Sequence, residues 1–177
     1  MAALQLGQKA INFTLRGVDN NLHTLIDYGD QVALAVIFSC NHCPYVQAWE
    51  GRLIQIQADY SDQGVQIIAI NADDPATYPD DSFENMVRRA HEKGYNFPYL
   101  FDETQAVARS YGATHLPEVF LFDHQRLLRY HGAIDDNHQN PQAVKRAYLR
   151  RALDAVLGGY LPPFEETELI GCTIKWK

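Results

Sequence analysis

The sequence predicts an α/β protein with a central mixed sheet flanked by helices, and three features of the chain indicate this class. Residues 32–38 and 65–70 are apolar runs without alternation, as expected of strands that are covered on both faces. Between them, apolar side chains recur at steps of three and four from Pro44 to about Tyr60, which predicts an amphipathic helix. A strand, a helix and a further strand in this order predict a βαβ unit with parallel strands.

Shorter elements are expected on both sides of this unit. Ser82, ahead of a helical pattern, predicts an N-cap, and Gly112 and the pair Gly158-Gly159 predict helix ends. The expected elements are an N-terminal hairpin (13–15 and 22–25), an inserted helix (82–92), a strand (99–101), a helix (103–111), a second hairpin (119–122 and 127–130), a last helix (141–157) and an extended tail (160–177).

Composition limits the class of protein. The chain has 177 residues, of which 46% are hydrophobic and 21% charged, and this suits one domain over residues 1–177. The formal net charge of −7 argues against a nucleic-acid-binding surface, since phosphate contacts require clustered Lys and Arg. Residues 1–8 carry neither a charged leader nor a long apolar segment, and no later stretch reaches transmembrane length. We therefore expect a cytoplasmic protein that binds neither nucleic acid nor membrane.

Cys40 and Cys43 form a C-x-x-C pair where the first buried strand gives way to the helix that begins at Pro44. Unpaired backbone N–H groups and the helix dipole stabilise a thiolate at such a position. Two thiols at this spacing can also close a disulfide. The pair therefore predicts thiol–disulfide exchange, with Cys40 as the attacking thiolate and Cys43 as the resolving thiol. On this assignment we expect Cys40 to be the more exposed and the more acidic of the two.

A structural zinc site is the main alternative for the two cysteines. Such a site needs four ligands, commonly from a second C-x-x-C or an H-x₃₋₅-H pair, and the sequence contains neither. We therefore expect no metal and no cofactor.

The third cysteine, Cys172, lies in the tail, where Ile170, Cys172 and Ile174 alternate with other residues. We interpret it as a packed apolar side chain that is out of disulfide reach of the C-x-x-C pair and dispensable for exchange. The alternative is a third redox thiol, which requires the tail to fold back over Cys40.

Several motifs resemble those of a known superfamily. A C-x-x-C that opens a helix after a buried strand, with Leu116-Pro117 ahead of a later hairpin, is similar to the thioredoxin superfamily over nearly the whole chain. Residues 40–46 (CNHCPYV), 71–74 (NADD) and 171–176 (GCTIKW) more closely resemble redoxins of the alkyl-hydroperoxide-reductase and thiol-specific-antioxidant type. The resemblance implies a thioredoxin-like fold.

The resemblance also implies roles for two further residues. Pro117 is expected to follow a cis peptide bond, to lie next to Cys40 and to shape the surface that receives a strand of the partner. His42 stands where protein disulfide isomerases have a His that stabilises the thiolate. It is therefore expected to tune the couple to a less reducing potential than that of thioredoxin. From the residues alone, His42 is equally well interpreted as a solvent-facing loop residue.

The chain also departs from these families. No acidic residue lies between Gln31 and Cys40, where thioredoxin has a buried Asp. Asp73 or Asp74 could replace it as a proton shuttle, because both follow a parallel strand that should end on the same sheet edge as Cys40. The simpler interpretation is that they are solvated loop carboxylates.

A comparison with peroxiredoxins gives a second departure. Their signature P-x-x-x-T-x-x-C, aligned on Cys43, places Val36 at the Pro position and Cys40 at the Thr position. A typical peroxide-binding pocket is therefore not expected.

These observations predict a thiol–disulfide oxidoreductase with Cys40, Cys43, Pro117 and His42 as its site residues. Its expected partners are a protein or small-molecule thiol or disulfide and a reducing partner. Two alternatives are a thiol-dependent peroxidase with an unusual pocket and a non-catalytic redox-sensing or binding module.

Overall fold

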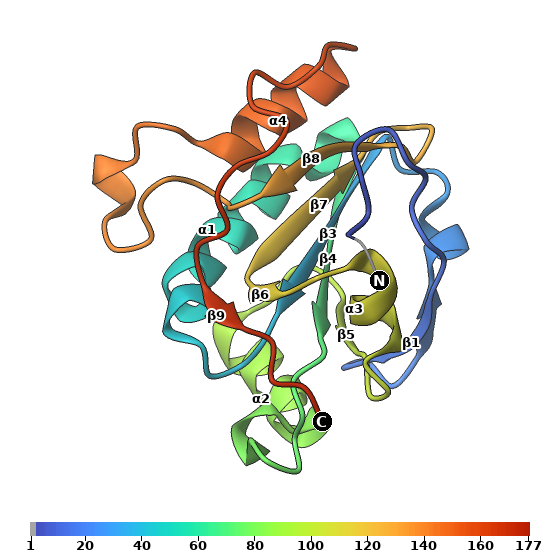
Figure 1. Ribbon diagram of the computed structural model, residues 1–177, viewed down its shortest axis with the longest axis vertical. Helices are drawn as coiled ribbons and strands as arrows, with labels where there is room; N and C mark the ends of the chain where they lie inside the picture. The colour runs from blue at the N-terminus through green and yellow to red at the C-terminus, as the bar shows by residue number, and fades with distance from the viewer. Residues whose placement is uncertain (1–2) are drawn as a thin grey trace.

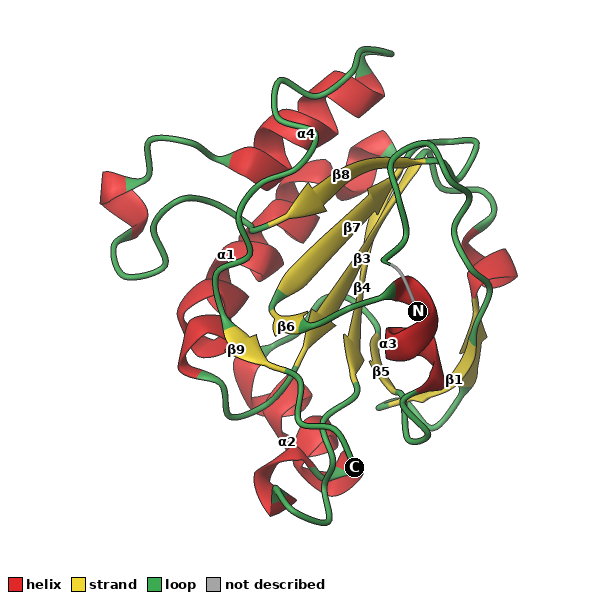
Figure 2. Cartoon of the chain, in the orientation of Figure 1, coloured by secondary structure: helices red, strands yellow, loops and turns green. Residues whose placement is uncertain are grey.

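Seven strands form a central sheet with helices on both faces in the computed structural model, which describes residues 3–177 (Figures 1 and 2). The α-helices are α1 (Pro44–Tyr60), α2 (Phe83–Lys93), α3 (Ala106–Tyr111) and α4 (Tyr148–Leu157). The strands are β1 (Thr14–Gly17), β2 (Leu22–Thr24), β3 (Ala33–Ser39), β4 (Val65–Asn71), β5 (Tyr99–Phe101), β6 (His115–Leu116), β7 (Glu118–Phe122), β8 (Leu128–Gly132) and β9 (Cys172–Thr173).

The sheet has the order β2-β1-β5-β4-β3-β7-β8 and contains both strand orientations. β3 runs parallel to β4 and antiparallel to β7, and α1 makes the crossover between β3 and β4. The predicted βαβ unit and the mixed sheet are therefore confirmed. In the β3–β4 register Ser39 lies opposite Asn71, so the segments after these two residues leave the sheet at the same edge.

Alternate residues of β3 contribute to two separate apolar cores, one on each face of the sheet. Ala35 and Ile37 belong to the core that α1 and α4 cover, with Trp49 of α1 fully buried in it. Val36 and Phe38 belong to the core that α3 covers, and this second core includes both cysteines of the C-x-x-C pair. Burial on both faces explains why the β3 sequence is apolar without alternation.

The two hairpins, the strand at 99–101 and the helix capped by Ser82 are confirmed; Ser82 Oγ accepts a hydrogen bond from Asn85 N at 3.2 Å. The helix expected over 103–111 begins only at Ala106, since Gln105 has a left-handed backbone with φ of 64°.

The helix predicted over 141–157 is wrong in its first part. Residues Pro141–Ala143 form a single 3₁₀ turn, and α4 starts at Tyr148. The intervening segment bonds instead to a neighbouring loop, with Lys145 N donating to Asp136 Oδ1 at 3.0 Å and Asp136 N donating to the Arg146 carbonyl at 3.2 Å. These tertiary hydrogen bonds compete with the helix and are not visible in a periodic pattern.

The C-terminal tail crosses the molecule and returns to the sheet edge where β3 ends (Figure 1). There β9 pairs antiparallel with β6, with Cys172 opposite Leu116. Within residues 3–177 no helix has both the length and the apolar character that a bilayer crossing requires.

Candidate active site

The C-x-x-C loop joins the end of β3 to the start of α1. Cys43 is the N-cap of α1, with an extended backbone (φ −70°, ψ 126°), and Pro44 occupies the first turn. Pro is tolerated there because its missing N–H would have no intrahelical partner. Cys40 is 0% exposed and Cys43 is 1% exposed, so both thiols lie below the surface.

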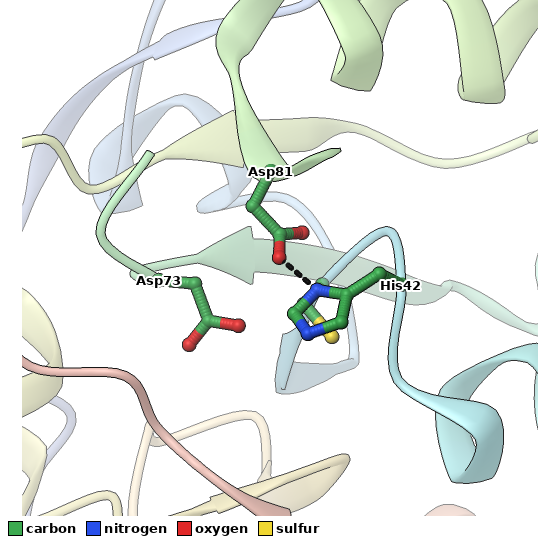
Figure 3. Close-up of side chains that lie close together, drawn as sticks. His42, Asp73 and Asp81 are labelled. Atoms are coloured by element: carbon green, nitrogen blue, oxygen red, sulfur yellow. Dashed lines mark hydrogen bonds and ion pairs between the residues drawn. The ribbon is translucent and has the colours of Figure 1, made fainter. Parts of the chain in front are cut away.

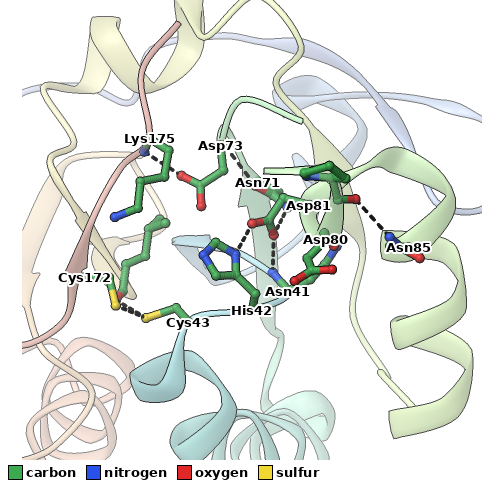
Figure 4. Close-up of polar contacts among 12 residues, drawn as sticks. Asn41, His42, Cys43, Asn71, Asp73, Asp80, Asp81, Asn85, Cys172 and Lys175 are labelled. Carbon is green, nitrogen blue, oxygen red and sulfur yellow. Dashed lines mark hydrogen bonds and ion pairs between the residues drawn. The ribbon is translucent and has the colours of Figure 1, made fainter. Parts of the chain in front are cut away.

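The sulfur atom of Cys43 contacts a second thiol and a backbone carbonyl group. Its Sγ lies 2.7 Å from Cys172 Sγ and 3.5 Å from the Leu116 carbonyl oxygen (Figure 4). Hydrogen bonding from the Cys40 thiol, supported by hydrogen bonding from Cys172, lowers the pKa of Cys43 to about 5 despite burial. These contacts favour the thiolate form of Cys43.

Cys40 has different surroundings, because two buried carboxyl groups, those of Asp73 and Asp81, lie near it. Its hydrogen bond to Cys43 raises the pKa of the Cys40 thiol, and burial and the negative charges of Asp81 and Asp73 raise it further. Each of these effects favours the protonated thiol. The prediction that Cys40 is the more exposed cysteine is wrong, since both thiols are buried, and these neighbours favour the thiolate at Cys43 rather than at Cys40. The helix start stabilises Cys43 rather than Cys40, because α1 begins after the second cysteine.

Asp81, in the turn Pro79–Asp81 before α2, holds the C-x-x-C loop and is 0% exposed. Its Oδ1 accepts hydrogen bonds from Asn41 N at 2.6 Å and from Asn71 Nδ2 at 3.2 Å, and its Oδ2 bonds to His42 Nδ1 (Figure 3). The segment that looked like an insertion thus supplies a buried carboxyl group to the site. Sequence reasoning missed Asp81, because an Asp-Asp pair before a helix is ordinarily a solvated capping segment.

His42 is half-buried, with a side chain that is 30% exposed. Besides the contact with Asp81, its ring stacks on Tyr78, with centroids 5.7 Å apart. It is therefore not a freely solvated loop residue, and its Nδ1 faces a carboxyl group.

Asp73 approaches the site from the end of β4. It is 2% exposed, its Oδ1 accepts a hydrogen bond from Lys175 N at 2.7 Å, and its Oδ2 has no hydrogen-bond partner (Figure 4). Burial raises the pKa of Asp73 to about 7. Asp74 is also buried, and it accepts hydrogen bonds from Ala76 N and the Thr77 hydroxyl in a local turn. The interpretation of both as solvated carboxylates is wrong, and Asp73 is the one that lies beside Cys40.

The Leu116–Pro117 peptide bond is cis, which confirms that prediction. Buried Glu118 fixes the preceding loop, since its Oε2 accepts hydrogen bonds from Thr114 N at 2.8 Å and His115 N at 2.9 Å. The Leu116 carbonyl of this loop accepts a hydrogen bond from Cys43 Sγ and not from Cys40.

The placement of Cys172 contradicts the sequence interpretation. Its sulfur is within disulfide reach of Cys43, and its side chain is only partly buried. Burial and hydrogen bonding to Cys43 raise the pKa of Cys172 to about 11. The tail does fold back over the C-x-x-C pair, a long-range contact that alternation within the tail could not reveal.

One group of side chains has the chemistry of a metal site. Ligand atoms of Cys40, His42, Asp73 and Asp81 all lie within 4.8 Å of one another. Sulfur, imidazole and carboxylate are ligands that zinc accepts. Both Asp81 oxygens already accept hydrogen bonds, so Cys40, His42 and Asp73 are the three residues that could hold an ion. Spacing rules missed the group because its members come from three separate segments.

The comparisons with known proteins agree with this architecture. The model of the AhpC/TSA family matches residues 6–131, which is more than half of the chain. The chain belongs to the AhpC/TSA family. A crystal structure of a hypothetical protein from Sinorhizobium meliloti is 40% identical, covers 99% of this chain and 97% of that chain, and superposes with a TM-score of 0.93.

Two further relatives carry names. The thiol-disulfide oxidoreductase ResA of Geobacillus thermodenitrificans is 28% identical over 123 residues, which are 68% of this chain and 65% of ResA, so this chain spans just under two thirds of that relative's length. The thioredoxin domain of a thiol-disulfide oxidoreductase from Bacteroides vulgatus is 19% identical and has a TM-score of 0.61 over 71% of this chain and 86% of that domain. At that identity the likeness concerns the fold, and it confirms the thioredoxin-like fold.

Proposed function

We propose that this protein is a thiol–disulfide oxidoreductase and that Cys40 and Cys43 are its exchanging pair. The names of the ResA relatives support redox activity at the level of the family. The observation that carries the proposal is the position of the pair: two buried thiols lie at the start of α1, where the pKa of Cys43 is lowered and that of Cys40 is raised. A thiolate is the nucleophile that exchange requires.

In the proposed reaction the dithiol gives two electrons and two protons to a disulfide substrate. Cys43 is the thiolate of the pair at neutral pH. Once Cys43 is joined to another sulfur, Cys40 attacks Cys43 Sγ, closes the Cys40–Cys43 disulfide and displaces that sulfur as a thiolate. Cys40 has to lose its proton for this step.

Asp73 is the proposed acceptor of that proton. Its pKa of about 7 lets it gain and lose a proton at neutral pH, and its Oδ2 has no other partner. The oxygen atoms of Asp81 are engaged with Asn41, Asn71 and His42, so Asp81 positions the loop instead. His42 is proposed to tune the couple, and Pro117 to hold the Leu116 carbonyl against Cys43.

Serine substitutions test the proposal directly. In a steady-state assay with a dithiol donor and a small disulfide, Cys40→Ser and Cys43→Ser are each expected to lower turnover by about 10³-fold or more, because the two thiols act as a unit. Asp80→Asn is a matched surface control, since Asp80 is exposed and next to Asp81, and it should leave turnover unchanged. Turnover that survives either cysteine substitution would contradict the proposal.

The alternative function is a thiol-dependent peroxidase, so the rate of oxidation by peroxide has to be compared with the rate of oxidation by a disulfide. A fast peroxidase needs donors that stabilise charge on the leaving oxygen, and here Cys40 and Val36 stand where peroxiredoxins have Thr and Pro. In stopped-flow oxidation of the reduced protein, a small disulfide is expected to react faster than hydrogen peroxide. A peroxide rate that exceeds the disulfide rate by orders of magnitude would favour the peroxidase.

A further inference from the structure

The three cysteines form a series from the surface inward. Cys172 on β9 is partly exposed, Cys43 is 1% exposed directly behind it, and Cys40 is 0% exposed. Cys43 is the middle member: it stands three residues after Cys40 in the C-x-x-C loop, and its Sγ lies 2.7 Å from Cys172 Sγ. An external molecule therefore meets Cys172 before it meets either cysteine of the C-x-x-C pair.

The position of Cys172 is fixed by backbone contacts on both sides of it. Leu116 and Cys172 are register partners in the β6–β9 pair, and Ile174 N donates to the Thr114 carbonyl at 2.9 Å. Gly171 passes so close to β6 that a Cβ at this position would lie 2.1 Å from the Leu116 carbonyl oxygen. The tail thus packs against the loop before Pro117, and these backbone contacts fix the position of Cys172 next to Cys43.

The packing of β9 against this loop also limits which class of substrate can reach the cysteines. The edge of the Leu116–Pro117 loop, which the thioredoxin resemblance implies as the place for a partner's strand, already holds the chain's own β9. A protein substrate could add its strand there only after β9 is released. A low-molecular-weight disulfide needs only the exposed sulfur of Cys172.

We propose that Cys172 is a third redox thiol, which reacts first with a low-molecular-weight disulfide. A Cys43–Cys172 disulfide then forms, and Cys40 converts it into the Cys40–Cys43 disulfide. The proposal rests on the thiol–disulfide exchange proposed above. It assigns the entry point and the substrate class of that reaction.

The steps balance without any further reagent. Cys172 attacks one sulfur of the external disulfide, and its proton goes to the first substrate sulfur, which leaves as a thiol. The Cys43 thiolate then attacks Cys172 Sγ, forms the Cys43–Cys172 disulfide and releases the second substrate thiolate. Cys40 then gives its proton to Asp73 and attacks Cys43 Sγ, which forms the Cys40–Cys43 disulfide and returns Cys172 as a thiolate. One external disulfide is reduced to two thiols, and two protein thiols are oxidised to one disulfide.

Peptide mapping can follow each of these species. Trypsin leaves Cys40 and Cys43 together in the peptide 17–52 and Cys172 in the peptide 152–175. A Cys43–Cys172 disulfide therefore links two peptides, and a Cys40–Cys43 disulfide is internal to one.

The experiment mixes the reduced full-length wild-type protein with one equivalent of oxidised glutathione and quenches it with acid and an alkylating reagent over time. The expected result is that the linked 17–52/152–175 species appears first and decays as the internal disulfide of 17–52 accumulates. An internal disulfide that forms with no earlier linked species would overturn the relay. This time course involves no substitution, so it does not depend on the folding of a variant.

Three variants locate the individual steps. Cys40→Ser is expected to stop at the linked species, and Cys43→Ser is expected to carry glutathione on the peptide 152–175. Glutathione found instead on Cys40 in Cys43→Ser would contradict entry through Cys172. As a matched control, Cys172→Ser combined with Thr173→Cys moves the thiol to the exposed opposite face of β9, and no link to Cys43 is expected.

The outcomes separate this inference from the proposed function. If the linked species forms in sequence but steady-state turnover is absent, the relay stands and the oxidoreductase proposal fails. If turnover proceeds at the wild-type rate in Cys172→Ser and no linked species is seen in the wild type, the oxidoreductase proposal stands and the relay fails.

Discussion

Cys40 and Cys43 are equally buried at the two ends of one loop, and the regions around them differ. The Cys40 side contains two buried carboxyl groups, from Asp73 and Asp81. The Cys43 side contains hydrogen-bond donors, from the first turn of α1 at Val46 and from Cys172 on the tail. Carboxyl groups favour a protonated thiol and hydrogen-bond donors favour a thiolate. Neighbours therefore decide which cysteine is the thiolate, and exposure does not distinguish them.

Gly171→Ala tests the Cys43 side and has the largest expected effect on disulfide formation. The new methyl group would overlap the Leu116 carbonyl oxygen, so β9 has to shift away from β6. We expect the yield of the Cys43–Cys172 link in a Cys40→Ser background to fall about tenfold or more, and overpacking to lower the free energy of unfolding by about 1–3 kcal/mol. Gly51→Ala on α1 is the control, since no atom lies within 4 Å of its Cβ position and the helix should gain stability. An unchanged yield in Gly171→Ala would mean that tail docking does not position Cys172.

Asp73→Asn tests the Cys40 side. The folded pKa of Asp73 is raised from 3.8 to about 7, so between these values the folded state keeps a proton that the unfolded state has lost. The contribution of this group to stability is therefore present at low pH and is lost as pH rises toward 7. Asp73→Asn should remove this loss, so the free energy of unfolding of the variant should rise relative to that of the wild type by up to about 4 kcal/mol between pH 4 and pH 8.

The neighbouring carboxyl group gives a control of opposite sign. Hydrogen bonding to Thr77 lowers the pKa of Asp74, so its contribution is present above the ordinary Asp pKa and is lost as pH falls. Chemical denaturation of the wild type, Asp73→Asn and Asp74→Asn over this pH range measures both trends. The same trend in both variants would contradict a raised pKa at Asp73.

His42→Ala has the smallest expected effect. Nδ1 of His42 bonds to Asp81, so the ring acts on the thiols only through the loop and its charge. We expect the potential of the Cys40–Cys43 couple to become more negative by about 30 mV or less. Equilibration with glutathione redox buffers measures the potential. A shift well above that size would place His42 in direct contact with the thiolate.

Local and periodic features were predictable from the sequence. The βαβ unit, both hairpins, Pro44 at the start of α1, and the cis bond before Pro117 follow from apolar patterns or from the family resemblance. The site was predictable only in part. Asp81 and Cys172 reach the C-x-x-C loop through contacts between segments far apart in the chain, and no local pattern encodes such contacts. The direction in which each thiol pKa is shifted could not be predicted for the same reason, since it depends on these long-range neighbours.

The central claim, that Cys43 is the thiolate, is tested most directly by the pH dependence of alkylation of the reduced wild-type protein. A small reagent such as iodoacetamide is applied between pH 4 and pH 9, and fragmentation of the peptide 17–52 reports each cysteine separately. The predicted result is that Cys43 is labelled first, with a rate that reaches half its plateau near pH 5, and that Cys40 reacts more slowly throughout. Faster labelling of Cys40 below pH 7, or a Cys43 rate that rises only above pH 8, would contradict the claim.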